Sequence, residues 1–377
     1  MTEYISMHTD IRPSFWRVKE YEELSTRINQ VFTQLLIPAA KKDVVCDYKK
    51  ILSSLYESGV GGLRYEAKNG GLGKGLAAQA LFAESLGIVP SGGIGMALTI
   101  HLDMVAPFID QYGTDQQIAD FLVPALKGDI LFSHAVSEPE AGSDINNIHT
   151  TAIQDGDGWR IQGKKSMISL AFLADVHFIV ARLPAFRAPF NMVNFLVPAD
   201  TPGLRVSPIR PTLGNHHCPI ADIELDNVQL DDSFRLGPIG MGMINQMQQF
   251  SQERILSSLR ANRLARRCLD YAMQPVDVFA DKLASLNAQW AASRAVTYRA
   301  MQTWIDGGEY LTLSCASKLL SSRLARQASR FALENAKAMQ TDSVEENLNQ
   351  VYDARLYSIS TGSDEMMLKT IAAAEKY

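Results

Sequence analysis

The chain of 377 residues is long enough for two or three domains, and its apolar content of 46% is ordinary for a globular protein. Its net charge of −5, without a long block of like charges, argues against a general nucleic-acid-binding protein. No run of 18 apolar residues is present, and residues 1–12 lack the basic-then-apolar order of a secretory signal, so we expect a cytoplasmic protein without a membrane span. The cysteines share no zinc or redox spacing, so we expect reduced thiols that pack in the core: Cys46, Cys218, Cys268 and Cys315.

Helical spacing dominates the first part of the chain. Apolar residues recur every three or four positions through residues 21–36 and again through residues 51–56, which is typical of helices that bury one face. Clusters of glycines separate these segments and favour turns between helices. We therefore predict an N-terminal helical domain over residues 1–128.

An extended pattern replaces the helical one in residues 129–236. Residues 150–154 and 159–162 flank the tetrapeptide Asp155-Gly156-Asp157-Gly158, a strong signal for a β-hairpin. Further predicted strands cover residues 176–182, 192–198 and 220–228. The pattern predicts a middle β domain, a barrel or a sandwich, over residues 129–236.

Helical spacing returns in residues 237–377. Residues 241–274 read as one long helix that ends at Pro275, because proline lacks the N–H that a helix interior needs. An inward apolar stripe on this helix predicts an antiparallel bundle, and consists of Ile255, Leu259, Leu269 and Ala272. Helices, strands and helices in this order predict the α+β fold class.

Two motifs in the predicted β domain resemble a known family. Residues 134–144 read HAVSEPEAGSD, and after the hairpin residues 163–169 read GKKSMIS. They resemble the T/S-E-P-x-A-G-S-D loop and the G-x-K-x-W-I-T strand of the acyl-CoA dehydrogenase family. Further signatures follow in the family's order, at Pro202-Gly203-Leu204, Leu213-Gly214, Gly240-Met241-Gly242 and Glu253-Arg254. The resemblance implies an N-terminal helical domain, a central β domain and a C-terminal helical bundle.

The resemblance also implies FAD as the cofactor and an acyl thioester as the substrate. In this chemistry a base removes a proton next to the thioester carbonyl, and the flavin accepts a hydride from the adjacent carbon. Ser137 would lie near flavin N5, and Ser143 toward the thioester arm of the substrate. The flavin contacts that the resemblance implies are His134, Val136, Ser137, Gly142, Met167, Ile168 and Ser169.

These residues also have plainer interpretations. Residues 134–143 would then be a rigid surface loop, Met167 ordinary strand core, and His134 a side chain that fills the β domain. Met167 and Ser169 stand where the family usually has Trp and Thr. Because Met is apolar and polarizable, we expect flavin to fit with altered packing.

The catalytic base is where the sequence departs from most of the family. Most members place a Glu near the C-terminus where this chain has Thr361. The Thr361 hydroxyl is too weak a base, but its backbone N–H could polarise the thioester carbonyl. A minority of members carries the Glu at a Glu-Arg pair on the first long C-terminal helix, which implies Glu253 as the base. The alternatives are an exposed Glu253 paired with Arg254 or another nearby cation, and a base elsewhere, such as Glu365.

Two segments that hold FAD in the family are missing. The Arg-x-x-Phe-Gly segment is absent after Ala272, which shortens the C-terminal bundle, and residues 334–340 replace a Gln-x-x-Gly-Gly-x-Gly loop. In the family these segments grip the pyrophosphate and adenine of a neighbouring subunit's FAD. Their loss argues against tight FAD binding and against the family's usual tetramer, and the alternatives are a loosely held flavin, a dimer or a relative without flavin. The partner that we expect for the chain is itself, in a homodimer or homotetramer.

A cluster of arginines follows Glu253 on the predicted helix, with members at Arg260, Arg263, Arg266 and Arg267. Arg263 stands where the family usually has Gly, and together with Arg254 we expect it near the substrate. A cationic helix face would suit the phosphate of phosphopantetheine or an acidic carrier protein. The alternative is a solvated face balanced by local acids.

The departures together favour a biosynthetic branch of the family. Its members oxidise acyl groups tethered to an acyl or peptidyl carrier protein, as in aminomalonyl-carrier-protein formation for antibiotic biosynthesis. The alternatives are a conventional dehydrogenase of a short or branched acyl-CoA thioester, and a non-catalytic scaffold of the same fold. Adjacent His216 and His217 have no further ligands in sequence, so we expect no metal site.

Overall fold

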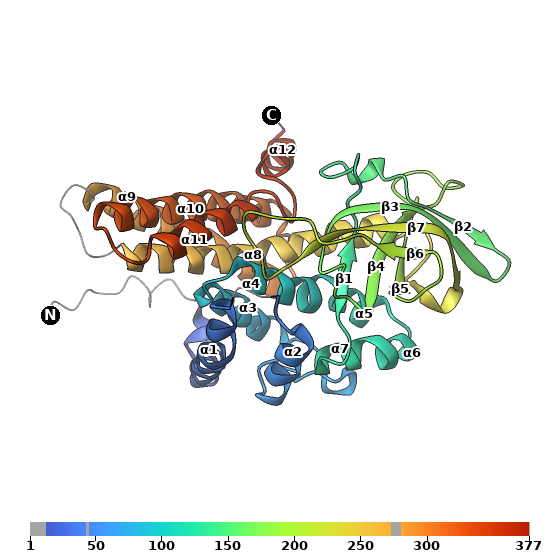
Figure 1. Ribbon diagram of the computed structural model, residues 1–377, viewed down its shortest axis with the longest axis horizontal. Helices are drawn as coiled ribbons and strands as arrows, with labels where there is room; N and C mark the ends of the chain where they lie inside the picture. The colour runs from blue at the N-terminus through green and yellow to red at the C-terminus, as the bar shows by residue number, and fades with distance from the viewer. Residues whose placement is uncertain (1–12, 43–44, 273–279, 377) are drawn as a thin grey trace. The chain divides into compact units, whose positions relative to one another are not determined.

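The structure, a computed structural model, describes residues 13–42, 45–272 and 280–376. The chain divides into two compact units (Figure 1). Unit 1 comprises residues 1–42, 74–92 and 250–377, and unit 2 comprises residues 43–73 and 93–249. The predicted end of the long helix at Pro275 lies outside the described residues.

Unit 1 is helical. Its short 3-10 helices are η1 (Ser14–Arg17) and η3 (Leu86–Ile88). Its α-helices are α1 (Lys19–Ala40), α3 (Gly75–Ser85), α8 (Gly242–Tyr271, whose first two turns belong to unit 2), α9 (Ala280–Ile305), α10 (Leu311–Ala338), α11 (Val344–Leu356) and α12 (Asp364–Ala374). Helices α9, α10 and α11 lie side by side (Figure 1).

The core of unit 1 lies among α8, α9 and α10. Buried side chains from the three helices form one cluster that includes Leu269, Trp290 and Phe331. The predicted inward stripe of α8 is confirmed, because Ile255, Leu259, Leu269 and Ala272 are all buried. The packing of this apolar stripe fixes α8 in the core, and the polar residues Glu253 and Arg254 are buried with it.

Unit 2 begins with helices. These are α2 (Tyr48–Glu57), η2 (Ala67–Asn69), α4 (Gly92–Thr99), the π-helical η4 (Ile100–Val105), α5 (Ala106–Tyr112), α6 (Asp115–Gln117), the π-helical η5 (Ile118–Leu122) and α7 (Val123–Lys127). By length and composition, residues 92–112 would be apolar enough to cross a membrane, but they are buried inside the structure. The burial shows that this segment packs in the interior of the fold.

The strands of unit 2 form a mixed sheet in the order β6-β7-β3-β2-β4-β5-β8, with β1 beside β4. They are β1 (Phe132–Ala135), β2 (Thr151–Asp155), β3 (Gly158–Ser169), β4 (Val176–Arg182), β5 (Met192–Pro198), β6 (Leu204–Val206), β7 (Ile220–Asp231) and β8 (Arg235–Leu236). Two 3-10 turns, η6 (Ile145–Asn147) and η7 (Asp232–Phe234), interrupt the connections.

The predicted hairpin and strands are confirmed. Asp155 pairs with Gly158 at the β2–β3 turn, and Gly156 adopts the left-handed conformation that such turns need. The strand predicted at residues 220–228 continues to Asp231, because the longer β3 pairs with it to its end. The order of helices, sheet and helices confirms the α+β class and the three-part architecture.

The cysteines behave as packing residues. All four are free thiols, and Cys218, Cys268 and Cys315 are buried. Among the residues that the structure describes, no group of three or more His, Cys, Asp or Glu side chains could hold a metal ion.

Candidate active site

A buried ion pair holds the loop that follows β1 in unit 2. The Lys165 ammonium on β3 lies 2.8 Å from the Glu138 carboxylate, and their side chains are 0% and 3% exposed. Lys165 also donates to the Val136 carbonyl (2.9 Å), and Glu138 accepts from the backbone N–H groups of His149 (2.6 Å) and Thr150 (3.0 Å). Burial lowers the pKa of Lys165 to about 8, against the opposing pull of Glu138. Burial alone would raise the pKa of Glu138, but the charge of Lys165 and the hydrogen bonds from Lys165, Thr150 and His149 together outweigh it, and the net shift is downward.

The residues of this loop that are predicted to contact the flavin or, in the case of Ser143, the substrate differ in exposure. Val136 is buried and Ser137 is half-buried, while Gly142 and Ser143 are exposed. The Ser137 carbonyl accepts from the Ser166 N–H at 2.9 Å, which joins the loop to β3. A Cβ atom added to Gly142 would meet nothing within 4 Å, so the loop leaves open space there.

His134, the third residue of β1, lies shortly before this loop. Its ring packs on Phe178 (5.0 Å between centroids) and Phe108 (6.3 Å), and its Nε2 lies 3.1 Å from the Gln246 Oε1. Burial lowers the pKa of His134 to about 4, so the ring is neutral at pH 7. Among the described residues, the buried Nε2 of Gln246 has no hydrogen-bond partner, and a donor is therefore available beside His134.

Met167 sits on a bulge of β3 and is not strand core. It has φ +60°, lies where the β3–β7 register shifts, and its side chain is 55% exposed. Asp222 holds the bulge, accepting from the Met167 N–H (3.0 Å) and from the Ser166 hydroxyl (2.9 Å). A hydrogen bond from Arg210 lowers the pKa of Asp222. The interpretation of Met167 as ordinary strand core is therefore wrong. The next two residues of the strand are less exposed, since Ile168 is buried and Ser169 is half-buried.

These features of unit 2 fit a flavin. A flavin ring needs an apolar surface for its faces and polar partners for its edge. Met167 supplies an exposed apolar side chain, and the half-buried Ser137 lies on the loop joined to the neighbouring Ser166. The unpartnered amide of Gln246 adds a buried donor.

In unit 1, the predicted base is completely buried. Glu253 lies on α8 with 0% of its surface exposed, so its interpretation as an exposed helix carboxylate is wrong. Its neighbour Arg254 is also buried and donates from Nε to the Thr361 carbonyl (3.1 Å) and from Nη1 to the Cys315 Sγ (3.5 Å). Glu365 is exposed at the start of α12.

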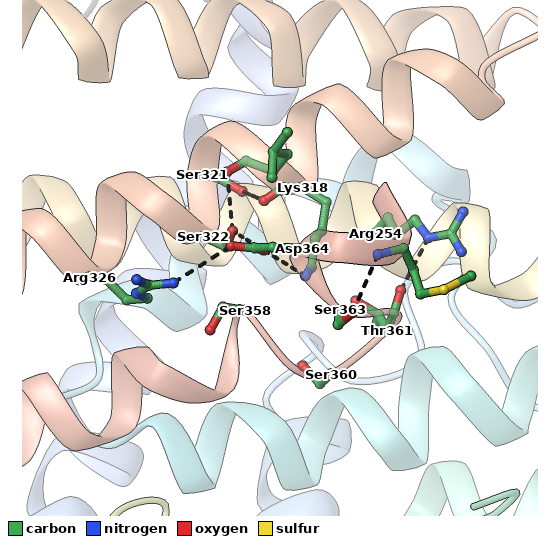
Figure 2. Close-up of polar contacts among 12 residues, drawn as sticks. Arg254, Lys318, Ser321, Ser322, Arg326, Ser358, Ser360, Thr361, Ser363 and Asp364 are labelled. Carbon is green, nitrogen blue, oxygen red and sulfur yellow. Dashed lines mark hydrogen bonds and ion pairs between the residues drawn. The ribbon is translucent and has the colours of Figure 1, made fainter. Parts of the chain in front are cut away.

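The Thr361 segment forms a left-handed turn in front of α12 (Figure 2). Thr361 has φ +54° and Gly362 has φ +94°. A Cβ atom on Gly362 would lie 2.8 Å from the Met367 Cε, so only glycine fits there without a shift. The buried Thr361 hydroxyl oxygen has no hydrogen-bond partner in the part of the chain that the structure describes.

A second buried ion pair anchors the start of α12. Asp364 accepts from Lys318 (3.1 Å) and Ser322 (2.7 Å) on α10 and lies 3.6 Å from the Arg326 guanidinium (Figure 2). Burial lowers the pKa of Lys318, and Asp364 opposes this shift. This pair and the pair of Lys165 with Glu138 leave no local pattern in the sequence, because their partners are 46 and 27 positions apart. The signal that the sequence does contain is a lysine within an otherwise apolar strand or helix, which indicates a buried ammonium group that needs an acidic partner.

The arginines that follow Glu253 do not form a cationic surface, which corrects the sequence expectation. Arg260 is buried and donates to the Tyr357 hydroxyl (2.9 Å), and Arg266 pairs with Asp270 (2.8 Å). Arg267 donates to the Gly87 carbonyl (3.1 Å). Arg263 lies against Gly87, because a Cβ atom added to Gly87 would be only 2.5 Å from the Arg263 Cβ. Distant segments of unit 1 thus supply the partners of Arg260 and Arg267, and a local carboxylate pairs with Arg266.

The structure describes one of the two segments that hold FAD in the family. Residues 273–279 lie outside the described part of the chain. Helix α10 continues to Ala338 where a glycine-rich loop is expected, and Glu334 on it pairs with Lys282 at 2.6 Å.

Comparison with known proteins adds independent evidence. Models described as the N-terminal, middle and C-terminal domains of acyl-CoA dehydrogenase match residues 19–129, 133–228 and 240–375. Curated relatives include a 3-(aryl)acrylate reductase of Clostridium sporogenes, 25% identical over 94% of this chain and 98% of that protein. Another is the mitochondrial short/branched chain specific acyl-CoA dehydrogenase of Bos taurus, 26% identical over 86% of this chain and 78% of that protein.

Solved structures share the fold. The prolyl acyl carrier protein oxidase AnaB has a TM-score of 0.88 and 22% identity, covering 96% of this chain and 100% of its own. PigA with FAD and proline has a TM-score of 0.90 and 21% identity, covering 95% of this chain and 98% of its own. With all three domain models matched in order over most of its length, the chain belongs to the acyl-CoA dehydrogenase family.

Proposed function

We propose that this protein is an FAD-dependent dehydrogenase of acyl thioesters with Glu253 as its catalytic base. The observation that carries the proposal is the complete burial of Glu253 on α8, in a family member whose usual base position holds Thr361. A carboxylate is costly to remove from water, so a buried one on the helix face used by some members favours a catalytic role. When bound, FAD supplies the hydride acceptor of the reaction.

The residues of unit 2 would hold the flavin. Ser137 and Gly142 on the loop and Met167 on the β3 bulge would contact it, and the Lys165–Glu138 pair would fix the loop. His134 would fix the Gln246 amide through its hydrogen bond. Because His134 is neutral at pH 7, it brings no charge to an uncharged ring.

The residues of unit 1 would handle the substrate. Glu253 would take the proton from the carbon next to the thioester carbonyl. The backbone N–H of Thr361 would donate to that carbonyl as negative charge develops on it. Arg254 would anchor the turn that carries this N–H, because it donates to the carbonyl on the other side of Thr361 at 3.1 Å and Thr361 has a left-handed backbone.

For the substrate, we propose an aminoacyl or hydroxyacyl group on an acyl or peptidyl carrier protein, as in aminomalonyl-carrier-protein formation. The full-length structural likeness to a prolyl acyl carrier protein oxidase supports this choice, as does the likeness to PigA with FAD and proline. The second candidate is a short or branched acyl-CoA, which the similarity to the short/branched chain specific enzyme favours. We expect a homodimer or homotetramer in either case.

The visible spectrum of the purified protein tests both cofactor and substrate. We expect a flavin spectrum, directly or after reconstitution with FAD, that bleaches on addition of a carrier-bound aminoacyl or hydroxyacyl thioester. Robust bleaching by free acyl-CoA esters with none by carrier-bound ones would favour the second candidate. Protein that stays colourless after reconstitution would overturn the proposal in favour of a scaffold.

Replacing the base tests its role. Glu253→Gln should slow flavin bleaching by about 10²–10⁴-fold, because it removes general-base catalysis, while the oxidised flavin spectrum is retained. Glu365→Gln changes an exposed carboxylate of the same unit and should bleach like the unmodified protein. Equal bleaching by the Glu253→Gln protein, or loss in the Glu365→Gln protein alone, would place the base elsewhere.

A further inference from the structure

An open cavity of about 340 Å³ lies between α10 and α12 of unit 1. Three arginines of α10 line it, Arg323, Arg326 and Arg330, and α12 contributes Asp364 and Glu365. The spacing of the arginines, three and then four residues, places them on one face of the helix. We call these three residues the α10 arginines.

The α10 arginines have unused hydrogen-bond donors. Arg323 and Arg330 are exposed, and within the described part of the chain neither forms an ion pair or a side-chain hydrogen bond. Arg326 is half-buried and reaches Asp364 only at 3.6 Å, and its buried Nε has no hydrogen-bond partner among the described residues. The cavity is therefore lined by guanidinium groups that face no strong partner.

The carboxylates at the cavity do not cancel this charge. Asp364 is buried and already binds Lys318 and Ser322 of α10 (Figure 2). Glu365 is exposed at the rim, and backbone N–H at the start of α12 together with Ser363 lowers its pKa, so it is ionised at pH 7. Three arginines therefore face two carboxylates, one of which Lys318 already neutralises, and this leaves the cavity with a net positive charge.

We propose that the α10 arginines form a binding site for the phosphate or diphosphate group of a small ligand. Guanidinium groups present planar pairs of donors that match phosphate oxygens, and the cavity volume is within the range of small-ligand sites. The site goes beyond the dehydrogenase reaction, because it uses none of the residues assigned to the base or the flavin. It is tested by binding alone, so its failure would leave the proposed reaction untouched.

Calorimetric titration of the full-length protein with inorganic pyrophosphate tests the site. We expect saturable binding that weakens as salt is raised. The Arg323→Ala/Arg330→Ala double variant should weaken binding about tenfold or more, because charge-assisted hydrogen bonds are lost. Both side chains are exposed, so the variant should keep its fold, which circular dichroism checks. Arg299→Ala on α9 removes another exposed arginine and should leave binding unchanged.

Two further ligands, ADP and 4′-phosphopantetheine, then identify the kind of molecule that carries the phosphate. Sulfate serves as the control for nonspecific anion binding. Tighter binding of ADP than of pyrophosphate supports a nucleotide, and tighter binding of 4′-phosphopantetheine supports a carrier-protein arm. In both cases the double variant must lose the preference. No saturable binding of any phosphate, sulfate binding as tight as that of pyrophosphate, or equal affinity in the double variant would overturn the proposal.

Discussion

Three histidines of unit 2 are held neutral by burial. The pKa of each of His101, His134 and His177 is lowered to about 4. His101 shows how the neutral ring is used, because its Nδ1 accepts from the Phe132 N–H (3.2 Å) and its Nε2 lies 2.9 Å from the Ala125 carbonyl. A doubly protonated ring could not accept the first bond. The connection between the helices and β1 therefore depends on a histidine that stays uncharged.

This neutrality predicts a loss of stability in mild acid. Between the unfolded pKa of about 6.5 and the folded pKa of about 4, only unfolded His177 binds a proton, so stability falls as pH falls through this window. At pH 5 the loss from His177 is about 2 kcal/mol. Urea unfolding at pH 7.5 and pH 5 measures it. His177→Gln should reduce the pH dependence by that amount, and exposed His216→Gln should not. An unchanged pH dependence in the His177→Gln protein would show that its charge is tolerated in the fold.

At the level of elements, β3 is a long strand whose last part departs from regular pairing. The shift in register between Lys165 and Ile168 turns the Met167 side chain outward, and Asp222 on β7 stabilises the irregular turn. The bulge thus links the buried Lys165–Glu138 pair to an exposed apolar side chain within three residues. Bulges are used in this way to re-aim side chains near functional sites.

The bulge should fail when its acceptor is removed. Asp222→Ala leaves the Met167 N–H and the Ser166 hydroxyl without their acceptor, which should cost about 1–3 kcal/mol of stability and weaken FAD binding. Asp226→Ala on the same strand removes an exposed partner of Arg205 and should change stability by less than about 1 kcal/mol. Thermal unfolding and FAD titration measure the two effects. Equal FAD affinity in both variants would separate the bulge from the cofactor.

The turn before α12 can be tested with two glycines. Gly362 and Gly307 both have positive φ, but a Cβ atom added to Gly307 would meet nothing within 4 Å, whereas one added to Gly362 would meet the Met367 Cε at 2.8 Å and the Arg254 Nη2 at 3.5 Å. Gly307→Ala should cost about 1–2 kcal/mol from left-handed strain alone. Gly362→Ala should cost about 1–3 kcal/mol more from overpacking, and it should slow flavin bleaching because the Thr361 peptide moves. Equal stability of the two variants would mean that the turn adapts, and unchanged bleaching would remove Thr361 from the reaction.

The elements that sequence predicted best are those defined by local pattern. The β2–β3 hairpin and strand β4 follow from turn residues and alternation within a few positions, and α8 follows from its apolar period. The arginines of α8 were misread because spacing shows which face they share and not what packs on it. Their partners Gly87 and Tyr357 lie far away in sequence. The ion pair of Lys318 with Asp364 was missed for the same reason.

For the whole molecule, family motifs carried the prediction where physical patterns could not. Composition and charge excluded classes of protein, but a flavin site was predicted only by the ordered motifs from residue 134 to residue 254. The burial of Glu253 is a property of the folded chain and cannot be read from the Glu-Arg dipeptide alone. The same dipeptide on an exposed helix face would not indicate a catalytic base. Helix α10 continues through the positions where the family has its glycine-rich FAD-binding loop. The affinity for FAD therefore has to be measured on the full-length protein.

Mass action connects FAD binding to the stability of the whole molecule. At 100 times its Kd, FAD should raise the free energy of unfolding by about 2.7 kcal/mol, because it binds the folded chain alone. Met167→Asp should remove most of this increase, since it replaces an exposed apolar contact by a charge, and Asp tolerates the left-handed backbone of Met167. Met339→Asp changes another exposed methionine and should keep the increase, as should Glu253→Gln. Urea unfolding at several FAD concentrations measures each variant. A full FAD-dependent increase in the Met167→Asp protein would place the flavin away from the β3 bulge.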